Sequence, residues 1–173
     1  LYHCTNDARN GVYSDKADAI IRNVIDTMEK CYPMRSLAVI TPFRDSVKEL
    51  QKRFCTSDIE LDITIETIDR IQGMTVDYAV LYVPGRNPGF ALEDRRFNVA
   101  TSRSLSTTLI ISDIPLNEFH TVSPTVIRFV DNCDKYDGDT RVISNDRLET
   151  TPIAEPSPHV EESPKQEFAN SSI

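Results

Sequence analysis

The chain has 173 residues, of which 39% are hydrophobic, 27% charged and 8% aromatic, as is typical of a globular domain with its own core. Its formal net charge of −8 argues against a protein held on nucleic acid or on an anionic membrane by bulk electrostatics. The acidic excess is uneven, because residues 136–173 carry 8 acidic and 3 basic side chains while residues 1–135 are close to balanced. Any basic site must therefore be local.

The cysteines and the hydropathy exclude further classes of protein. The cysteines lie far apart, with no Cys-x-x-Cys pair and no histidine at ligand spacing, so we predict neither a metal site nor a dense disulfide framework. No apolar run approaches the roughly 18 residues of a membrane span, and no secretory signal opens the chain, so we expect no membrane partner. Reduced thiols are the default for such cysteines, so we expect an intracellular protein. Because the chain starts at Leu1 and not at methionine, we also expect it to be a segment of a longer protein.

Hydrophobic periodicity predicts a helix, a strand and a second helix in the first third of the chain. Apolar residues recur at three-to-four spacing after Ser14, a favourable N-cap, which predicts a helix over residues 14–31. Residues 36–41 are almost continuously apolar, as in a parallel strand buried on both faces. Residues 44–54 place apolar and charged side chains on opposite faces, which indicates a surface helix.

The same alternation continues, with strands expected over residues 62–66, 77–83 and 107–112 and helices over residues 93–104 and 124–133. This order is typical of an α/β fold with a mostly parallel sheet flanked by helices. The link between the first two of these strands has only about ten residues, which is short for a crossover helix. Either the link is a single helical turn or the two strands are not parallel neighbours.

The last part of the chain differs in composition. Periodicity fails from about Lys135, and residues 152–164 carry four prolines among Ser, Thr and Glu. Such a segment buries too little apolar surface to offset its ordering entropy. We therefore predict a folded domain over residues 1–137 and a disordered acidic tail over residues 138–173.

The first of three polar segments near predicted strand ends is Thr41-Pro42-Phe43-Arg44. In open α/β sheets, ligands bind where the strands end. A hydroxyl and a cation beside a helix N-terminus, whose free amides favour anions, suit a phosphate. The alternative is that Thr41 and Pro42 only shape the turn between strand and helix.

The second polar segment covers residues 66–73 and ends in Gln72-Gly73, with Thr67 and Asp69 just upstream. In a tight link, the amide side chain of a glutamine and the unhindered backbone of a glycine can hydrogen-bond to a phosphate oxygen or to an attacking water. The alternative is an ordinary turn with Gly73 at a positive φ angle.

The third polar segment covers residues 93–103, on a predicted helix before a buried strand. Arg96 and Arg103 are seven residues apart, about two helical turns, so they are expected to share one helical face. Two arginines on one helical face can bind phosphate oxygens. One of them could act as an arginine finger, which stabilises the charge on a transferred phosphoryl group. The alternative is two solvated cations. Phe90, just upstream, either caps a ligand cleft or anchors a loop.

In order and spacing, the three blocks TPFR, ETIDRIQG and EDRRFNVATSR, the last two each followed by a hydrophobic strand, resemble the second RecA-like domain of superfamily 1 helicases. The likeness is greatest to the Upf-like group, whose members run along RNA or DNA, and it spans about residues 11–115. It implies a RecA-like P-loop NTPase fold and the C-terminal motor domain of an ATP-dependent helicase.

The resemblance implies roles at a nucleotide. Arg103 matches the arginine finger that reaches the γ-phosphate of ATP from the second domain, and Gln72 would act beside it as a catalytic residue. Gly73 and Arg96 would line the same cofactor cleft, which holds ATP with Mg²⁺.

The resemblance also implies a grip on single-stranded RNA or DNA. Thr41 and Thr67 match family hydroxyls that touch the nucleic-acid backbone, and they would contact phosphates with Pro42 beside them. Asp69 and Asn98 match motif positions that link the two sites or brace the helix, and we assign them to the nucleic-acid site.

Two departures and one absence limit what the chain can do alone. Thr75 stands where the family has an acidic residue associated with the ribose, and Leu105 stands where it has an arginine or lysine, whereas Asp77 matches. None of the five glycines begins the G-x-x-x-x-G-K-[ST] pattern, so the chain has no P-loop lysine. We expect no ATP hydrolysis by this chain alone, with the P-loop and the magnesium ligands on a preceding RecA-like domain of the parent chain.

Three hypotheses follow. The favoured one is a helicase motor domain, cytoplasmic or nuclear. The alternative is a degenerate RecA-like module that binds nucleic acid or a protein without ATPase activity, which Thr75 and Leu105 support. A third is a small α/β domain with a coincidental likeness. It would be favoured if Gln72 and Arg103 lay on opposite sides of the sheet instead of converging at its carboxyl edge.

Overall fold

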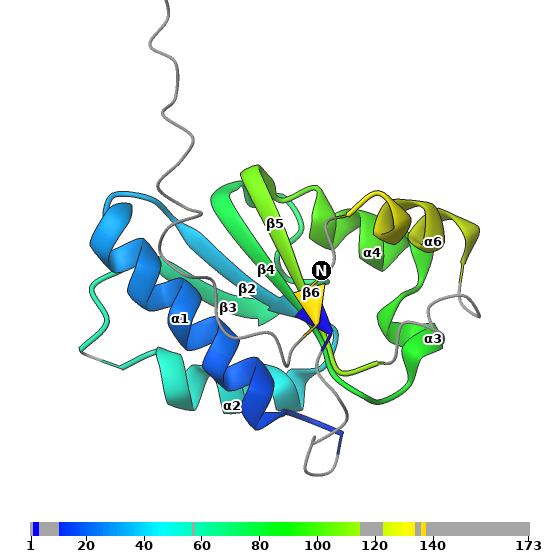
Figure 1. Cartoon of the computed structure of the whole chain (residues 1–173), viewed down its shortest axis with the longest axis horizontal. Helices are drawn as coiled ribbons and strands as arrows, with labels where there is room; N and C mark the ends of the chain where they lie inside the picture. Colours follow the sequence, from blue (N-terminus) through cyan, green and yellow to red (C-terminus); the bar gives the residue numbers. More distant parts are fainter. Residues whose placement is uncertain (1, 4–10, 57, 115–122, 134–135, 138–173) are drawn as a thin grey trace, which may run out of the picture. The chain divides into compact units, whose positions relative to one another are not determined.

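The computed structural model describes residues 2–3, 11–56, 58–114, 123–133 and 136–137 (Figure 1). The chain divides into two units, and every described residue belongs to the first unit, residues 1–142. The predicted disordered tail over residues 138–173 lies outside the described residues.

One sheet of six strands forms the centre of the described part, in the order β3-β2-β4-β5-β1-β6. Every neighbouring pair is parallel, which confirms the predicted α/β class and is consistent with a RecA-like fold. Because β2 lies between β3 and β4, the two strands joined by the short link are not neighbours. The strands are Tyr2–His3 (β1), Leu37–Thr41 (β2), Ile63–Thr67 (β3), Val76–Val83 (β4), Ser104–Ser112 (β5) and Tyr136–Asp137 (β6).

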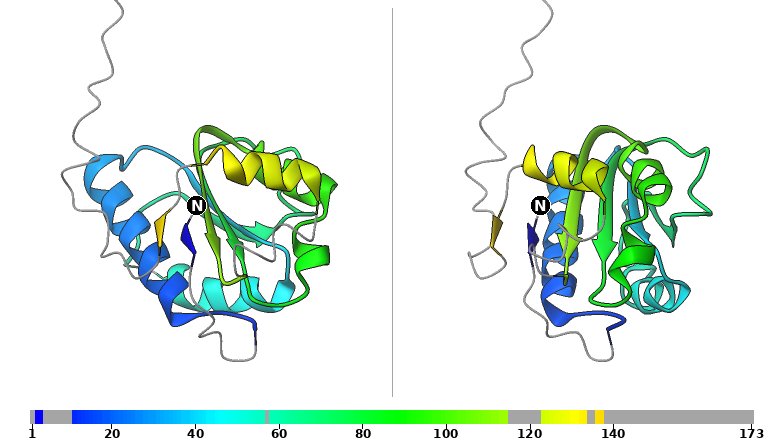
Figure 2. Two further views of the ribbon diagram at one scale, coloured as in Figure 1. Left: turned by 45° about the vertical axis from the view of Figure 1, so that its right-hand side comes forward. Right: turned by 90° about the vertical axis from the view of Figure 1, so that its right-hand side faces the viewer.

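Helices cover both faces of the sheet, α1 and α2 on one side and α3, α4 and α6 on the other (Figures 1 and 2). The guanidinium carbon of Arg22 on α1 lies 5.1 Å from the ring centre of Phe54 on α2. On the other side, the rings of Phe97 on α4 and Phe129 on α6 meet edge to face at 5.2 Å. The helices are Asp15–Cys31 (α1), Arg44–Phe54 (α2), Pro88–Ala91 (α3), Asp94–Thr101 (α4) and Pro124–Asp131 (α6).

The alternation of side chains along β2 divides the core between the two faces of the sheet. Ala38 and Ile40 belong to a buried cluster that includes Phe97 and Ala100 of α4. Leu37 and Val39, which alternate with them along β2, point to the opposite face, which α1 and α2 cover. Thr41, the last residue of β2, belongs to this second set, so its side chain points away from α4.

A buried polar network ties the start of α1 to β4 and to the end of β5. The Oγ atom of Ser14 caps α1 by accepting from the Ala17 amide at 3.1 Å, and it donates to Asp113 Oδ1 at 2.7 Å. The Tyr82 hydroxyl donates to Asp113 Oδ2 at 2.6 Å and accepts from the Ser14 amide at 3.1 Å. Burial, followed by the charge of Asp113, raises the pKa of Tyr82, so its hydroxyl keeps its proton and remains a donor.

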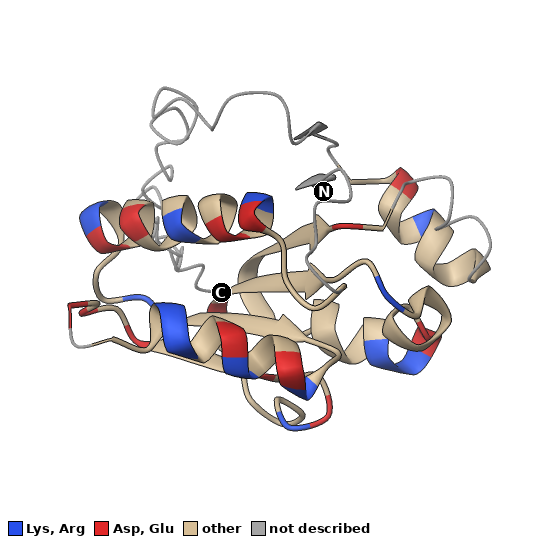
Figure 3. Ribbon diagram, turned by 90° about the horizontal axis from the view of Figure 1, so that it is seen from below, with Lys and Arg blue, Asp and Glu red and all other residues tan. Residues whose placement is uncertain are grey.

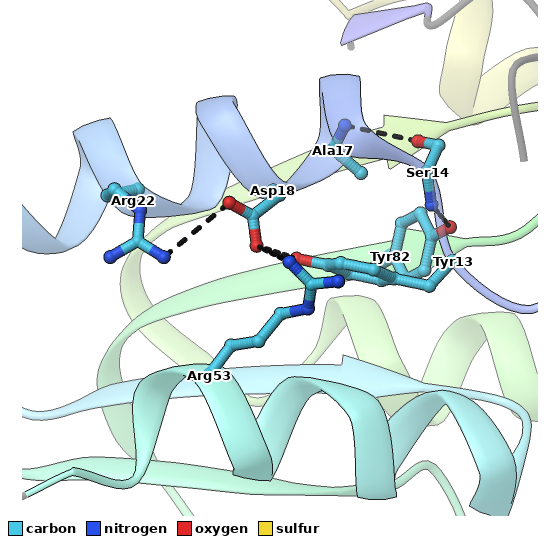
Figure 4. A network of polar contacts seen from close by, with 7 residues as sticks. All are labelled: Tyr13, Ser14, Ala17, Asp18, Arg22, Arg53 and Tyr82. Carbon is cyan, nitrogen blue, oxygen red and sulfur yellow. Dashed lines mark hydrogen bonds and ion pairs between the residues drawn. The ribbon is translucent and has the colours of Figure 1, made fainter.

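A second network joins α1 to α2 (Figure 4). Asp18 accepts a hydrogen bond from the Tyr13 hydroxyl at 2.8 Å and pairs with Arg53 at 3.3 Å and Arg22 at 3.5 Å. Burial and the bond to Asp18 raise the pKa of Tyr13. Figure 3 shows acidic and basic residues interspersed along both helices. This surface is therefore not a basic track for nucleic acid.

Several boundaries differ from the sequence-based expectations. The helix predicted over residues 93–104 ends at Thr101, and β5 begins at Ser104 because the Val76 amide of β4 donates to the Arg103 carbonyl at 3.0 Å. The last helix ends at Asp131 and not at residue 133. The two-residue strands β1 and β6 were not predicted, and neither was α3.

Candidate functional site

A shallow pocket of about 350 Å³ lies between the segment that follows β3 and helix α4. It brings together Asp69 and Gln72 from the second polar segment and Arg96 from the third. This volume lies at the low end of the roughly 300–1,000 Å³ of ligand sites, so the pocket suits a small ligand or part of a larger one. Its other lining residues are Ile68, Glu93, Arg95 and Val99.

Arg96 is held from three directions in this pocket. Its Nη1 donates to Glu93 Oε2 at 2.9 Å, and its Nε lies 3.6 Å from Asp69 Oδ1. Its guanidinium carbon lies 4.1 Å from the ring centre of Phe90. The side chain is 27% exposed, and Nε has no hydrogen-bond partner among the described residues. An anion that enters the pocket therefore meets a positioned cation, in competition with two carboxylates.

The contact with Phe90 is one end of a column of four side chains from four separate segments. Arg86 lies over the ring of Phe43 at 4.2 Å, the rings of Phe43 and Phe90 stack at 5.5 Å with an angle of 24°, and Arg96 lies over Phe90. We call these four residues the Arg–Phe column. The sequence-based alternatives for Phe90 left this pairing open, because stacking depends on tertiary structure. The only sequence signals were an aromatic after Thr41-Pro42 and another after Pro88-Gly89.

Arg103 lies beyond the end of α4, directly before β5. Its Nε donates to the Val99 carbonyl at 2.8 Å, its Nη2 to Ser102 Oγ at 2.8 Å, and its Nη1 to the Met74 carbonyl at 3.4 Å. The prediction that Arg103 shares a helical face with Arg96 is wrong, because the helix ends before Arg103 so that the chain can enter the sheet.

Gln72 and Arg103 lie on the same side of the sheet, the side that α4 covers. Gln72 lines the pocket against α4, and Arg103 bonds to Met74, close to Gln72 in the chain. The expectation that both converge at the carboxyl edge is wrong for Arg103, because a residue before a parallel strand lies at the amino edge. The structure therefore shows neither the convergence that the helicase hypothesis expected nor the opposite sides that would favour a coincidental likeness.

Three residues of the two predicted sites are exposed. Gln72, Gly73 and Asn98 are all accessible on the surface. Gly73 has a φ angle of +91°, a conformation that other residues rarely adopt, as the turn alternative required. No described atom lies within 4 Å of the position that a Cβ would take there, so the backbone is open to a ligand.

Thr41 and Thr67, both predicted to contact nucleic-acid phosphates, are partners in the register of β2 and β3. Both are buried, with 0% and 7% exposure, and so is Pro42. The Thr41 Oγ1 atom has no hydrogen-bond partner among the described residues. This hydroxyl can therefore reach a phosphate only if this edge of the sheet moves.

The Thr41 hydroxyl provides a test of stability. Replacement of Thr41 by valine keeps the shape and removes a polar atom without a described partner, so T41V is expected to raise the free energy of unfolding by about 1 kcal/mol. The measurement is urea unfolding followed by circular dichroism. The control is S46A, which removes a buried hydroxyl that donates to the Val12 carbonyl at 2.7 Å and should lower stability. Equal losses in both variants would contradict the expectation.

Asp77, which matches the family motif, braces the amino edge of the sheet. Its carboxylate accepts from the amide and the hydroxyl of Ser36, both at 2.9 Å, and from Arg35 Nη1 at 2.9 Å. The Ser36 amide bond, then the Ser36 hydroxyl and Arg35, lower the pKa of Asp77. These contacts give Asp77 a structural role.

The lowered pKa predicts a dependence of stability on pH. Since the folded pKa lies below the unfolded value of about 3.9, the ionised carboxylate stabilises the fold above about pH 4, and this contribution is lost as the pH falls through the folded pKa. In D77N, the carboxyl group that titrates is replaced by an amide that does not. We expect the gap between the urea midpoints of the natural chain and D77N to be constant near neutral pH and to shrink below about pH 4. A gap that persists to the lowest pH at which both fold would exclude this mechanism.

Comparison with known proteins places the pocket in a family context. A family model described as an AAA domain matches residues 4–114. The chain belongs to the AAA domain family. Over 108 residues this AAA domain is 31% identical to the "DNA polymerase alpha-associated DNA helicase A" of Saccharomyces cerevisiae (strain ATCC 204508 / S288c). The match covers 59% of the chain but only 16% of the yeast protein. These matches confirm the predicted helicase-type domain.

Two further features of the described residues concern a metal site and a membrane-spanning helix. Within the described ranges, no group of three or more His, Cys, Asp and Glu side chains is placed to hold a metal ion. None of the helices found in those ranges has the length and apolar character needed to cross a membrane.

Proposed function

We propose that this AAA domain is the C-terminal motor domain of an ATP-dependent helicase of superfamily 1, in the Upf-like group, acting on single-stranded RNA or DNA in the cytoplasm or nucleus. The observation that carries the proposal is the pocket, because it joins Asp69, Gln72 and Arg96 from two separate motif blocks. The yeast relative is by name a DNA helicase, which supports the same activity.

ATP with Mg²⁺ is the proposed cofactor, and the residues present fit one half of its site. Arg95 and Arg96 offer cations to phosphates at the pocket, and Gly73 offers open backbone. The chain has no P-loop pattern, so a preceding RecA-like domain of the parent chain would supply that loop and the magnesium ligands. When bound, ATP supplies the phosphoanhydride bond whose hydrolysis drives the motor.

Arg103 is the proposed arginine finger, with Gln72 beside the reacting phosphate as the second catalytic residue. An arginine finger stabilises the charge that develops on the transferred phosphoryl group, and it does so only when the two domains close. The guanidinium of Arg103 now bonds to the carbonyls of Val99 and Met74. Closure must exchange at least part of these hydrogen bonds for contacts with phosphate.

The carboxyl ends of β2 and β3 are the proposed grip on the nucleic-acid backbone. Thr41, Pro42 and Thr67 lie there side by side, while Asp69 and Asn98 lie on the segments that border the pocket. Because the grip is local and the chain carries a net charge of −8, the domain alone should bind a single strand only weakly.

The experiment that tests the proposal measures ATP hydrolysis by the longer protein that contains this chain. We expect single-stranded DNA or RNA to stimulate hydrolysis, and we expect the isolated chain to hydrolyse no ATP. A longer protein that binds the strand but hydrolyses no ATP would instead be the degenerate module. The exposed Thr75 and the 75% exposed Leu105, which replace charged family residues, favour that second candidate.

A further inference from the structure

We propose that Phe43 and Phe90 are positioning residues that couple Arg96 in the pocket to the strand end at Thr41-Pro42. The proposal rests on the function proposed above, and it adds a physical connection between the nucleic-acid grip and the nucleotide pocket. The connection is the Arg–Phe column.

One end of the column is fixed to the proposed grip. Phe43 directly follows Thr41-Pro42, and it is the N-cap residue of α2, with its carbonyl accepting from the Val47 amide at 3.1 Å. Its half-buried ring packs against the core cluster on the α4 side of the sheet. Phe43 therefore connects the buried Thr41 on one face to the pocket on the other. Any movement of the main chain at Thr41-Pro42 must also move this ring.

The other end of the column is fixed to the pocket. Phe90 lies on α3, whose start is set by Asn87 in a left-handed conformation with a φ of 42°. The side chain of Asn87 accepts from the Phe90 amide at 3.3 Å, which holds the ring in place. The guanidinium of Arg96 lies over this ring, 4.1 Å from its centre. Arg96 therefore depends on Phe90 as well as on carboxylates for its position.

The column has room to respond. The distance of 3.6 Å between Arg96 Nε and Asp69 Oδ1 is too long for a good hydrogen bond, and the side chains of Arg86 and Arg96 are 32% and 27% exposed. At the far end, Arg86 pairs loosely with Asp45 at 3.6 Å. Cation–π contacts are less directional than hydrogen bonds, so a shift of Phe43 can pass through Phe90 and reorient Arg96 without unfolding the core.

The test uses nuclear magnetic resonance on the whole 173-residue chain, so it needs no ATPase activity. A single-stranded oligo(dT), and separately an oligo(U), is added while the backbone amides of Thr67 and Ile68 and the side-chain Nε–H of Arg96 are followed. We expect both sets of signals to shift together in the natural chain. In F43L, which keeps an apolar side chain but removes the ring, the amides should still shift while the Arg96 response falls at least threefold.

Two further variants control for a merely structural effect. F43Y keeps an aromatic ring at this position, so the Arg96 signal should shift as it does in the natural chain. F129L removes another partly exposed phenylalanine that also pairs with a ring, but outside the column, and it should leave the response unchanged. If F43L fails to fold, F90L carries the same test from the other side of the stack.

The outcomes separate the two proposals. If the amides shift and the Arg96 signal does not, or if F43L leaves the Arg96 response intact, the coupling is overturned and the proposed grip stands. If neither the amides nor Arg96 respond to saturating oligo(dT) or oligo(U), the grip itself fails, and the coupling fails with it.

Discussion

If Arg103 is the arginine finger of the proposed parent protein, its replacement by alanine is expected to lower the nucleic-acid-stimulated ATPase rate of that protein by about 10³-fold or more. In the absence of nucleotide, the affinity of R103A for single-stranded nucleic acid should stay within about twofold of the natural value. The side chain of Arg103 bonds to the carbonyls of Val99 and Met74 and not to the ends of β2 and β3, where the grip is proposed. Steady-state hydrolysis and fluorescence anisotropy with a labelled oligonucleotide measure the two quantities.

The matched control is R128A. Arg128 on α6 also bonds to a main-chain carbonyl, that of Pro124 at 3.3 Å, but it lies outside the three polar segments. R103K adds a second test, because lysine keeps the charge and loses the planar fork, so it should recover little of the rate. If R103A hydrolysed ATP as fast as R128A, Arg103 would not be the finger.

Replacement of Phe97 by alanine is expected to lower the free energy of unfolding by about 3–5 kcal/mol, the range for a fully buried aromatic. Phe97 is 0% exposed and lies in the cluster that attaches α4 to the sheet. Urea unfolding of the isolated chain, with a common slope for both proteins, gives the difference.

F129A is the comparison for this loss, because Phe129 is the ring that meets Phe97 edge to face yet is 39% exposed. It should cost much less, since part of its surface already contacts water. Losses of the same size for the two variants would show that α6, and not the sheet, is what holds α4. A small loss for F97A would show that α4 tolerates a cavity at its centre.

The elements with a clear period were predicted well. The surface helix over residues 44–54 has the same bounds in the structure, because its apolar and charged faces alternate without interruption. The strand ending at Thr41 was recognised because its residues are buried on both faces. Two-residue strands and the single turn of α3 are too short to carry a period, so the sequence could not reveal them.

The end of α4 illustrates a second limit. Amphipathic spacing continues past Thr101, but the hydrogen bond from the Val76 amide to the Arg103 carbonyl draws the chain into β5. Tertiary pairing thus overrides the local pattern and moves Arg103 from a helical face to a strand start. The order of the strands is likewise a property of the whole sheet and not of any segment.

The sequence indicated some residues of the pocket but not its geometry. Three motif residues, Asp69, Gln72 and Arg96, do line one pocket. The predicted phosphate contact of Thr41 did not take into account the burial predicted for its strand, which leaves the hydroxyl 0% exposed in the structure. The stacking of Phe43 on Phe90 joins segments that lie far apart in the sequence, so no local pattern predicts it.

The pairing of β1 has a consequence for how the domain is made. Tyr2 is aligned with Ile111 of β5, so β1 has no partner among the described strands until most of the domain has been synthesised. Parallel pairs of such separation close slowly, because the entropy of a long loop must be lost before the contact forms. The sheet can grow outward from β2 and β4, with the β1 edge closing last. Until then, the β5 edge that β1 will cover stays unpaired, and an unpaired strand edge exposes a partly folded chain to aggregation.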